Sequence, residues 1–141
     1  MVDASVVVKW YLADEEAAEK AASVGEAFKR GEMTLVAPSI APYEVSRALQ
    51  KAYRQHRVST HVAEQLIDDL LNLNLDLFHE PEIFRSALRL AFRYGCNFYD
   101  ACYLALAELL DVPFIFADNK LETQLAGKID YALPLHRLEL V

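Results

Sequence analysis

The chain has 141 residues, of which 54% are hydrophobic and 25% are charged, and its formal net charge is -7 at pH 7. These totals predict one globular domain over residues 1–141 and exclude a disordered chain. No uncharged apolar segment is long enough for a membrane span and no secretory leader is recognisable, so we expect a cytoplasmic protein with no membrane contact. Cys96 and Cys102 are too few for a disulfide framework, and their spacing fits no zinc site.

Helical spacing and short apolar runs alternate along the chain. Residues 6–12 fit a strand or a helix, because an apolar run of that length does not distinguish the two. Helix boundaries and periodicity predict helices at 14–31, 39–56, 59–73, 81–95 and 99–112. Short buried strands are predicted at 33–38, 75–78 and 131–135, and within 112–121, where a strand ends at Asp118 and a short helix follows. This order predicts an α/β fold with a short parallel sheet covered on both faces.

Four acidic residues adjoin apolar segments. Asp3, Asp100 and Asp118 are each at a position where an aspartate often caps a helix, and Glu44 suits the positive end of its helix. Capping explains each acid separately but predicts no convergence of the four. If they do converge, their repulsion requires a cation, and a carboxylate cluster without His or Cys favours Mg²⁺ or Mn²⁺. Such a cation promotes attack of water on a phosphodiester, which predicts phosphodiester hydrolysis.

The segments VDASVVVKW, PSIAPYEVSRAL, FYDACYLALAE and FIFADNKL follow one another in an order and spacing that resemble the PIN-domain ribonucleases. Within that family the chain is most similar to the VapC-type toxins of toxin-antitoxin pairs. The resemblance implies a three-layer α/β/α sandwich, a Mg²⁺- or Mn²⁺-dependent endoribonuclease, a homodimer, and inhibition by a cognate antitoxin. The apolar segment 62–75 is a candidate dimer surface, although the same face also suits the core.

The resemblance also assigns roles to individual residues. It matches Asp3, Glu44, Asp100 and Asp118 to the acidic quartet of the family, and it implies that the three aspartates hold the metal directly or through water. Ser5 matches a hydroxyl that the family places beside its first aspartate. Asn119 follows the last acid and offers a further oxygen to the metal, or serves only as a turn residue.

Basic residues are concentrated in two acid-free stretches of this acidic chain. Helical spacing places Arg47, Lys51 and Arg54 on one stripe with Glu44, which predicts a track for RNA phosphates. Arg89 and Arg93 extend that prediction to the helix before Asp100. The alternative is that these side chains pair with surface acids or with an acidic antitoxin tail.

Three tyrosines adjoin the acids, namely Tyr43, Tyr94 and Tyr99. They are candidates for stacking on RNA bases, although we expect at least two of them to be packing residues.

The chain departs from the family pattern at two places. Only Met1 and Val2 precede Asp3, so either the first strand is short or the start codon is misplaced. Phe116 stands where the family commonly carries a hydroxyl, two places before the last aspartate. This second departure supports the alternative to an enzyme, which is a PIN-fold module with weakened catalysis that binds RNA or a partner. A phosphatase that forms an aspartyl-phosphate is disfavoured, because position 5 is serine and not a second acid.

Overall fold

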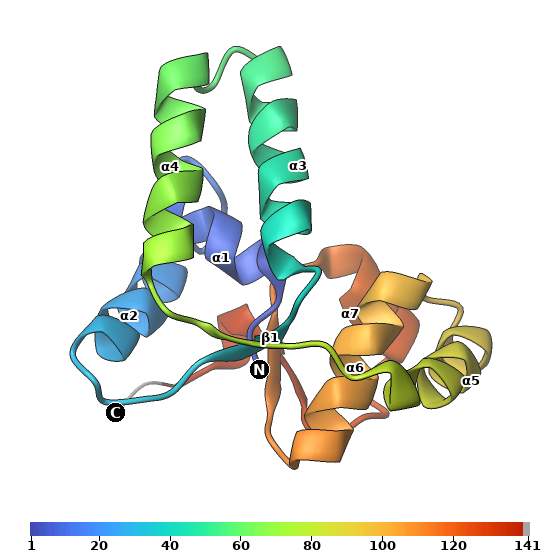
Figure 1. Cartoon of the computed structure of the whole chain (residues 1–141). Helices are drawn as coiled ribbons and strands as arrows, with labels where there is room; N and C mark the ends of the chain where they lie inside the picture. The colour runs from blue at the N-terminus through green and yellow to red at the C-terminus, as the bar shows by residue number, and fades with distance from the viewer. Residues whose placement is uncertain (140–141) are drawn as a thin grey trace.

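The computed structural model describes residues 1–139 (Figure 1). Its named strands form two parallel pairs. Strand β1 (Val36–Pro38) pairs with β2 (Asp76–Phe78), and β3 (Phe114–Phe116) pairs with β4 (Ala132–Pro134).

The N-terminal residues join the two strand pairs into one surface. The amide of Val2 donates to the carbonyl of Val36 at 3.0 Å, and the amide of Asp3 donates to the carbonyl of Ile115 at 2.9 Å. Val2 also forms a parallel bridge with Ile115 and is fully buried. Residues 1–3 therefore act as a very short central strand in the order β2, β1, residues 1–3, β3, β4.

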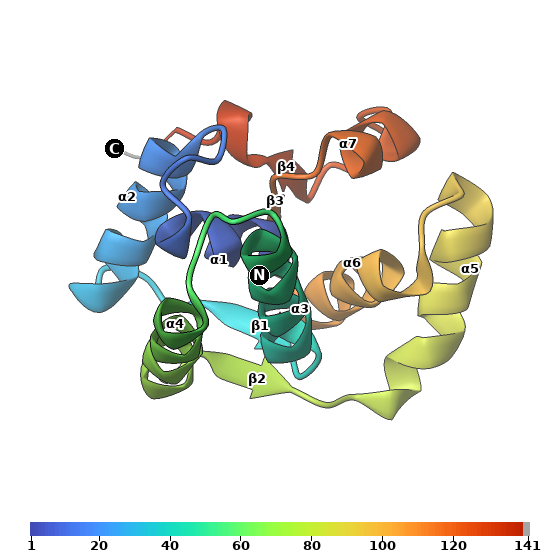
Figure 2. The same cartoon turned by 90° about the horizontal axis from the view of Figure 1, so that it is seen from above.

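Seven α-helices and two short 3₁₀ helices connect the strands within residues 1–139. The α-helices are α1 (Ala4–Tyr11), α2 (Ala18–Lys29), α3 (Ala41–Arg54), α4 (Thr60–Asn72), α5 (Phe84–Tyr94), α6 (Phe98–Leu110) and α7 (Asn119–Leu125). The 3₁₀ helices are η1 (Pro81–Ile83) and η2 (Leu135–Arg137). Seen from above, α1, α2 and α4 lie on one side of the strands, and α5, α6 and α7 lie on the other (Figure 2). This arrangement confirms the predicted three-layer α/β/α fold.

The ambiguous segment after Asp3 is a helix, α1, in spite of its valines. Asp3 caps the helix, and Val6 and Val7 are fully buried. The central strand position is already filled by residues 1–3, so this valine run is buried as a helix between the sheet and its neighbours α2 and α3. Tertiary packing thus overrides the strand preference of β-branched residues.

Two predicted helices begin later than the sequence indicates. The helix expected over 14–31 starts only at Ala18, because residues 13–17 form turns and Ala17 has a left-handed backbone with φ of 59°. The helix expected over 81–95 begins with η1 and becomes α-helical at Phe84.

The core lies on both faces of the strands. Helix α6 is the most buried helix, with residues 101–107 all buried, as its apolar sequence predicts. Phe114 and Phe116 pack in the cluster that contains α6, while Ile115 packs against the cluster that contains α1. This alternation is the two-residue period of a strand covered on both faces. Cys96 and Cys102 are buried free thiols.

No helix among residues 1–139 has the length and apolar character needed to cross a membrane. The prediction of a single domain over residues 1–141 remains a prediction.

Candidate active site

Two of the predicted acids lie where neighbouring parallel strands end. Asp3 follows the central strand, and Asp118 follows β3 and begins α7. The carboxyl ends of parallel neighbours lie at the same edge of a sheet, so the two acids are brought to one place. Both also cap helices: Asp3 accepts from the amide of Ser5 at 3.1 Å, and Asp118 accepts from the amide of Leu121 at 3.1 Å. Capping and convergence therefore coexist at these residues.

Ser5 links the two acidic strand ends, as its predicted supporting role requires. Its hydroxyl donates to Oδ2 of Asp3 and accepts from the amide of Ala117 at 3.0 Å. Ala117 directly precedes Asp118, so a single hydroxyl fixes the Asp3 carboxylate against the end of β3. The pKa of Asp3 is raised to about 6, mainly by burial; the Ser5 hydrogen bonds oppose this rise and the charge of Asp118 contributes to it.

Glu44 enters the site from the first turn of α3, a helix that begins near Pro42. The hydroxyl of Tyr103 donates to Oε1 of Glu44 at 2.8 Å and so holds this carboxylate toward α6. Burial raises the pKa of Glu44 to about 7, and the Asp3 charge adds to the rise.

Sequence reasoning missed Tyr103, which is fully buried in the apolar helix α6. A polar hydroxyl in that core helix was the available signal, because buried tyrosine hydroxyls usually have a hydrogen-bond partner.

Asp100 lies in the first turn of α6. The expectation that it caps its helix is wrong: Asn97 takes that role and accepts from the amide of Asp100 at 2.8 Å. Burial raises the pKa of Asp100 to about 7, with further increases from Asp3, Asp118 and Glu44, and a smaller opposing effect of Lys120. The carboxylate of Asp100 therefore interacts electrostatically with all three other acids.

The donor set suits a hard divalent cation. Four carboxylates repel one another in a partly buried place, which is the condition that cation binding relieves. Within residues 1–139 no three His, Cys, Asp or Glu side chains are arranged to hold one ion together. Mg²⁺ usually takes one or two carboxylates and completes its shell with water, so an ion here would be held partly through water.

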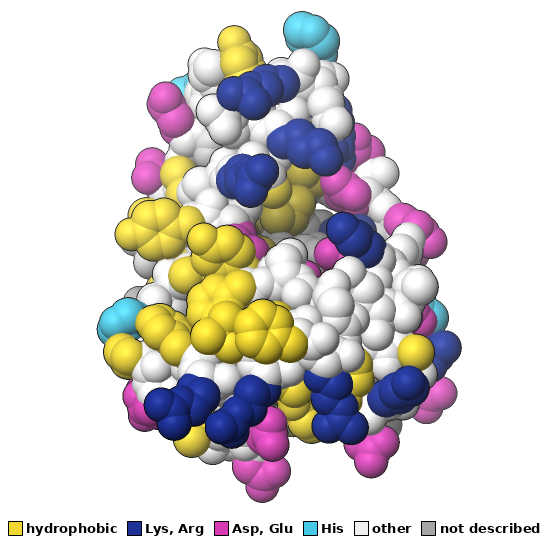
Figure 3. Space-filling model, turned by 90° about the vertical axis from the view of Figure 1, so that its right-hand side faces the viewer, with side chains coloured by type: hydrophobic (Ala, Val, Ile, Leu, Met, Phe, Trp, Pro, Cys, Tyr) yellow, Lys and Arg dark blue, Asp and Glu magenta, His cyan; other side chains and the backbone are white. Residues whose placement is uncertain are grey.

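A groove of about 600 Å³ runs from Glu44 along α3, and its lining includes Arg47, Lys51, Tyr43 and Tyr99. Figure 3 shows basic side chains above and beside a hollow in which acidic side chains are visible, and further basic side chains near the lower edge of the molecule, beyond a band of hydrophobic and uncharged side chains. The structure thus brings two of the predicted basic residues beside the acids. The other three, Arg54, Arg89 and Arg93, are exposed on α3 and α5 outside this groove.

The expectation that at least two of Tyr43, Tyr94 and Tyr99 are packing residues is wrong. Tyr43 is 78% exposed and Tyr99 is 57% exposed, so both present their rings to solvent beside the groove. Only Tyr94 is partly buried, and the guanidinium of Arg93 lies 5.5 Å from its ring centroid.

Phe116 and Asn119 flank Asp118. Phe116 is buried and stacks on Phe114 with ring centroids 5.4 Å apart, so this position gives the site no hydroxyl. Asn119 is exposed at the start of α7, and among residues 1–139 its side chain makes no hydrogen bond with the carboxylates.

Comparison with known proteins places this fold and site in a family. The sequence model of the PIN domain matches residues 1–124, and the chain belongs to the PIN domain family. The chain is 28% identical over 123 residues to "Ribonuclease VapC3" of Pyrobaculum aerophilum, covering 86% of this chain and 90% of that protein. It is 31% identical over 96 residues to "Exonuclease VapC9" of the same organism, covering 68% and 71%.

Two further likenesses agree with this assignment. "Ribonuclease VapC1" of Mycobacterium tuberculosis is 35% identical over 86 residues, which is 60% of this chain and 63% of that protein. The crystal structure of PAE2754 from Pyrobaculum aerophilum superposes with a TM-score of 0.70 at 24% identity, covering 96% of this chain and 89% of that one. The superposition supports the fold.

Proposed function

We propose that this PIN-domain protein is a Mg²⁺- or Mn²⁺-dependent endoribonuclease and the toxin of a type II toxin-antitoxin pair. The observation that carries the proposal is the mutual interaction of Asp3, Glu44, Asp100 and Asp118 at one end of the strands, where burial and repulsion raise the pKa of three of them. Relatives that are named ribonucleases support RNA as the substrate.

The four acidic residues have two different proposed roles. Asp3, Asp100 and Asp118 hold the cation directly or through water, and Glu44 completes the negative site. Ser5 and Tyr103 fix the orientation of Asp3 and Glu44 through their hydroxyl groups. When bound, the cation positions the scissile phosphate, favours attack by water, and stabilises the charge that develops on the phosphoryl group.

Internal cleavage of a chain is favoured by the placement of the basic residues. Arg47 and Lys51 extend along α3 from the acids, while Arg89 and Arg93 lie on α5. A basic groove wall beside the acids, with further basic side chains on a second helix, suits a strand that continues past the site rather than one that ends there. We therefore propose an endonuclease, although one relative is named an exonuclease.

A cognate antitoxin and a second copy of the chain are the proposed protein partners. The antitoxin is proposed to place its tail in the groove along α3, where Arg47 and Lys51 suit an acidic segment. Val62 and Leu71 of α4 are 40% and 60% exposed, in agreement with the candidate dimer segment 62–75. Light scattering of the purified chain checks the dimer, and co-purification with the product of the neighbouring gene checks the antitoxin.

Cleavage of RNA by the purified protein tests the central proposal. Structured and unstructured RNA are incubated with and without Mg²⁺, beside the variant Asp100→Asn, which keeps the shape of the side chain and removes its charge. We expect cleavage of the unstructured RNA only with Mg²⁺, and a loss of about 100-fold or more in the variant. Cleavage that persists in the variant would overturn the assignment of the site.

Binding of Mn²⁺, measured by calorimetry, separates the enzyme from the alternative of a weakened RNA- or partner-binding module. An enzyme binds the ion with an affinity that Asp3→Asn or Asp100→Asn abolishes. A binding module without catalysis, which Phe116 keeps under consideration, shows neither the ion affinity nor its loss.

A further inference from the structure

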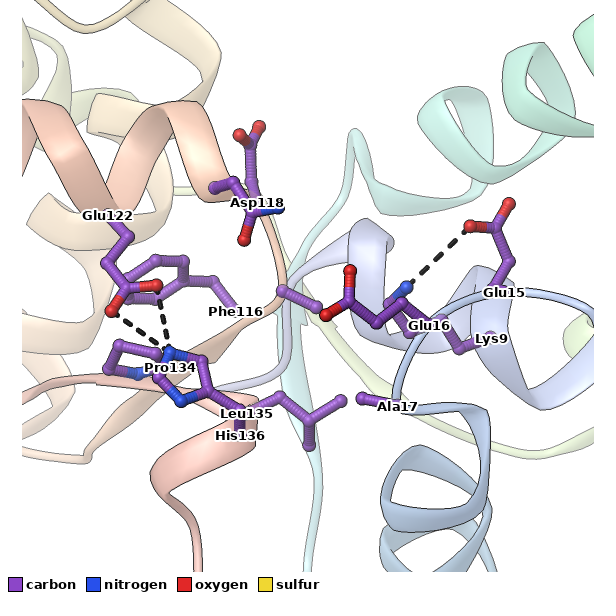
Figure 4. A pocket seen from close by; sticks show the side chains of 12 residues that line it. Lys9, Glu15, Glu16, Ala17, Phe116, Asp118, Glu122, Pro134, Leu135 and His136 are labelled. Carbon is purple, nitrogen blue, oxygen red and sulfur yellow. Dashed lines mark hydrogen bonds and ion pairs between the residues drawn. The ribbon is translucent and has the colours of Figure 1, made fainter.

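A second pocket, of about 210 Å³, is lined in part by Asp118 and shares no lining residue with the groove along α3. One wall is formed by α1 and the turn at residues 13–17, and the other by the end of β3, the start of α7 and η2. Figure 4 shows Asp118, Glu122 and His136 on one side of this space and Lys9, Glu15 and Glu16 on the other. The pocket therefore adjoins the proposed cleavage site and is separate from the basic track.

Lys9 is a largely buried cation that forms an ion pair and no hydrogen bond among residues 1–139. Its side chain is only 9% exposed, and its Nζ lies 3.7 Å from Oε2 of Glu15, within ion-pair distance and beyond hydrogen-bond distance. The nitrogen itself still touches solvent. Lys9 lines this pocket, and Figure 4 shows its nitrogen joined to the Glu15 carboxylate at the pocket wall. An oxygen or nitrogen acceptor of a ligand in the pocket would supply the hydrogen bond that Glu15 does not.

Glu16 provides a free carboxylate beside Lys9. It is exposed, and within the described part of the chain it makes no ion pair and no side-chain hydrogen bond. Figure 4 shows its carboxylate directed into the same space as the Lys9 nitrogen. On the opposite wall, Glu122 and His136 already bond each other at 2.9 Å. Lys9 and Glu16 are therefore the donor and the acceptor that remain for a ligand.

The wall that carries Glu16 is held in place from a distant part of the chain. Arg57, which follows α3, donates to both carboxylate oxygens of Asp14 at 2.9 and 2.7 Å and to Glu15 at 2.8 Å. This fork-shaped pairing fixes the turn at residues 13–17. The pocket is thus shaped before any ligand arrives.

The charge of the pocket disfavours a phosphate. Its lining contains Asp118 and three glutamates against Lys9 and His136, so a second anion meets a negative environment. A neutral nucleobase with both acceptors and N–H donors suits it better.

Building on the proposed function, we propose that this pocket receives an unpaired guanine next to the cleaved bond. Lys9 donates to O6 or N7 of the base, as lysine does where it recognises guanine elsewhere. Glu16 accepts from N1–H and from the exocyclic amine, a pair of parallel donors that uracil does not have. A base reaches such a pocket only when it is unstacked, so the substrate is single-stranded at this point.

Titration of the metal-free protein with guanosine, inosine and uridine, followed by backbone amide resonances, tests this assignment. We expect guanosine to shift amides of residues 16–17 and 117–119, inosine, which lacks the exocyclic amine, to bind more weakly, and uridine to bind about 10-fold more weakly than guanosine. Lys9→Met and Glu16→Gln should each weaken guanosine binding by about 10-fold or more.

Glu19→Gln is the matched control, because Glu19 is an exposed glutamate near the same loop that does not line the pocket. Glu16→Gln carries the test if the buried substitution at Lys9 unfolds the protein. Equal shifts with guanosine and uridine, or unchanged guanosine binding in Glu16→Gln, would overturn the proposal. The titration needs neither metal nor cleavage, so a negative result does not affect the nuclease proposal. In the same way, a failure to observe nuclease activity does not affect the proposed guanine pocket.

Discussion

The hydroxyl of Tyr103 donates a 2.8 Å hydrogen bond to Oε1 of Glu44, across 59 positions of sequence. This contact ties the core helix α6 to the first turn of α3 at the acidic site. It also partly offsets the effect of burial on Glu44, because a donor stabilises the charged carboxylate and lowers its pKa.

Replacement of this tyrosine tests whether the contact positions Glu44 for a cation. Tyr103→Phe keeps the ring in the core and removes the donor, so Mn²⁺ affinity measured by calorimetry should fall by about 10- to 100-fold. Tyr131→Phe is the control, since it removes a tyrosine hydroxyl that interacts with Glu108, outside the site. Equal Mn²⁺ affinity of Tyr103→Phe and the wild-type protein would show that Glu44 needs no such support.

The hydroxyl of Ser5 should matter both for catalysis and for stability. In Ser5→Ala, the Asp3 carboxylate loses one donor and the amide of Ala117 loses its acceptor. We expect a 10- to 100-fold loss of RNA cleavage, by analogy with other residues that orient metal ligands, and a loss of about 1 kcal/mol in unfolding free energy.

Ser46→Ala is the matched control for this substitution. Its hydroxyl bonds the carbonyl of Pro42 at 2.7 Å on the exposed side of α3. Cleavage rates, with chemical denaturation of the same samples, check both variants. Full activity in Ser5→Ala would mean that the Asp3 cap alone fixes the carboxylate.

The raised pKa values of the site make the stability of the metal-free protein depend on pH. Asp3, Glu44 and Asp100 ionise near pH 6 to 7 when folded, but near their ordinary lower values when unfolded. Between these values the folded state binds more protons, so these groups lower the unfolding free energy as pH rises through that window.

Asp100→Asn removes one of these ionisable groups and makes the effect measurable. Without metal, the melting temperature of the variant relative to wild type should be higher at pH 8 than at pH 4.5. Adding Mn²⁺ at pH 8 should stabilise the wild type more than the variant, because the ion offsets the repulsion. A difference in melting temperature that stays constant with pH and metal would contradict the proposed charge cluster.

The basic residues of the α3 groove should bind RNA through its phosphates. Arg47→Gln combined with Lys51→Gln removes two charges beside Glu44, and RNA affinity should fall. The slope of log affinity against log salt should decrease in magnitude by about 1.4 for a single strand. Fluorescence anisotropy with labelled RNA, in the Asp100→Asn background to prevent cleavage, measures both quantities.

A second double variant serves as the control for charge alone. Lys29→Gln combined with Arg30→Gln removes the same charge at the end of α2, where these residues pair with nearby glutamates. An equal decrease of affinity and slope in both double variants would show that net charge, and not the groove, governs RNA binding.

The sequence was enough to identify the family and the α/β layering, and it predicted the four acids as the site. The apolar runs that end at Asp3 and Asp118 predicted where strands stop, because a buried strand must be apolar and the first charge ends it. The spacing of Glu44, Arg47 and Lys51 predicted one helix face, since helical periodicity is a local property of the chain.

Only the tertiary structure decided how these residues are held. Residues 6–12 became a helix because the central strand position was already occupied by residues 1–3. The contacts of Tyr103 with Glu44, of Ser5 with Ala117, and of Arg57 with Asp14 join segments that are 59, 112 and 43 positions apart. Such contacts depend on how the chain is packed, and no local pattern specifies them. For the same reason no local pattern indicated that Lys9 is buried beside a second pocket.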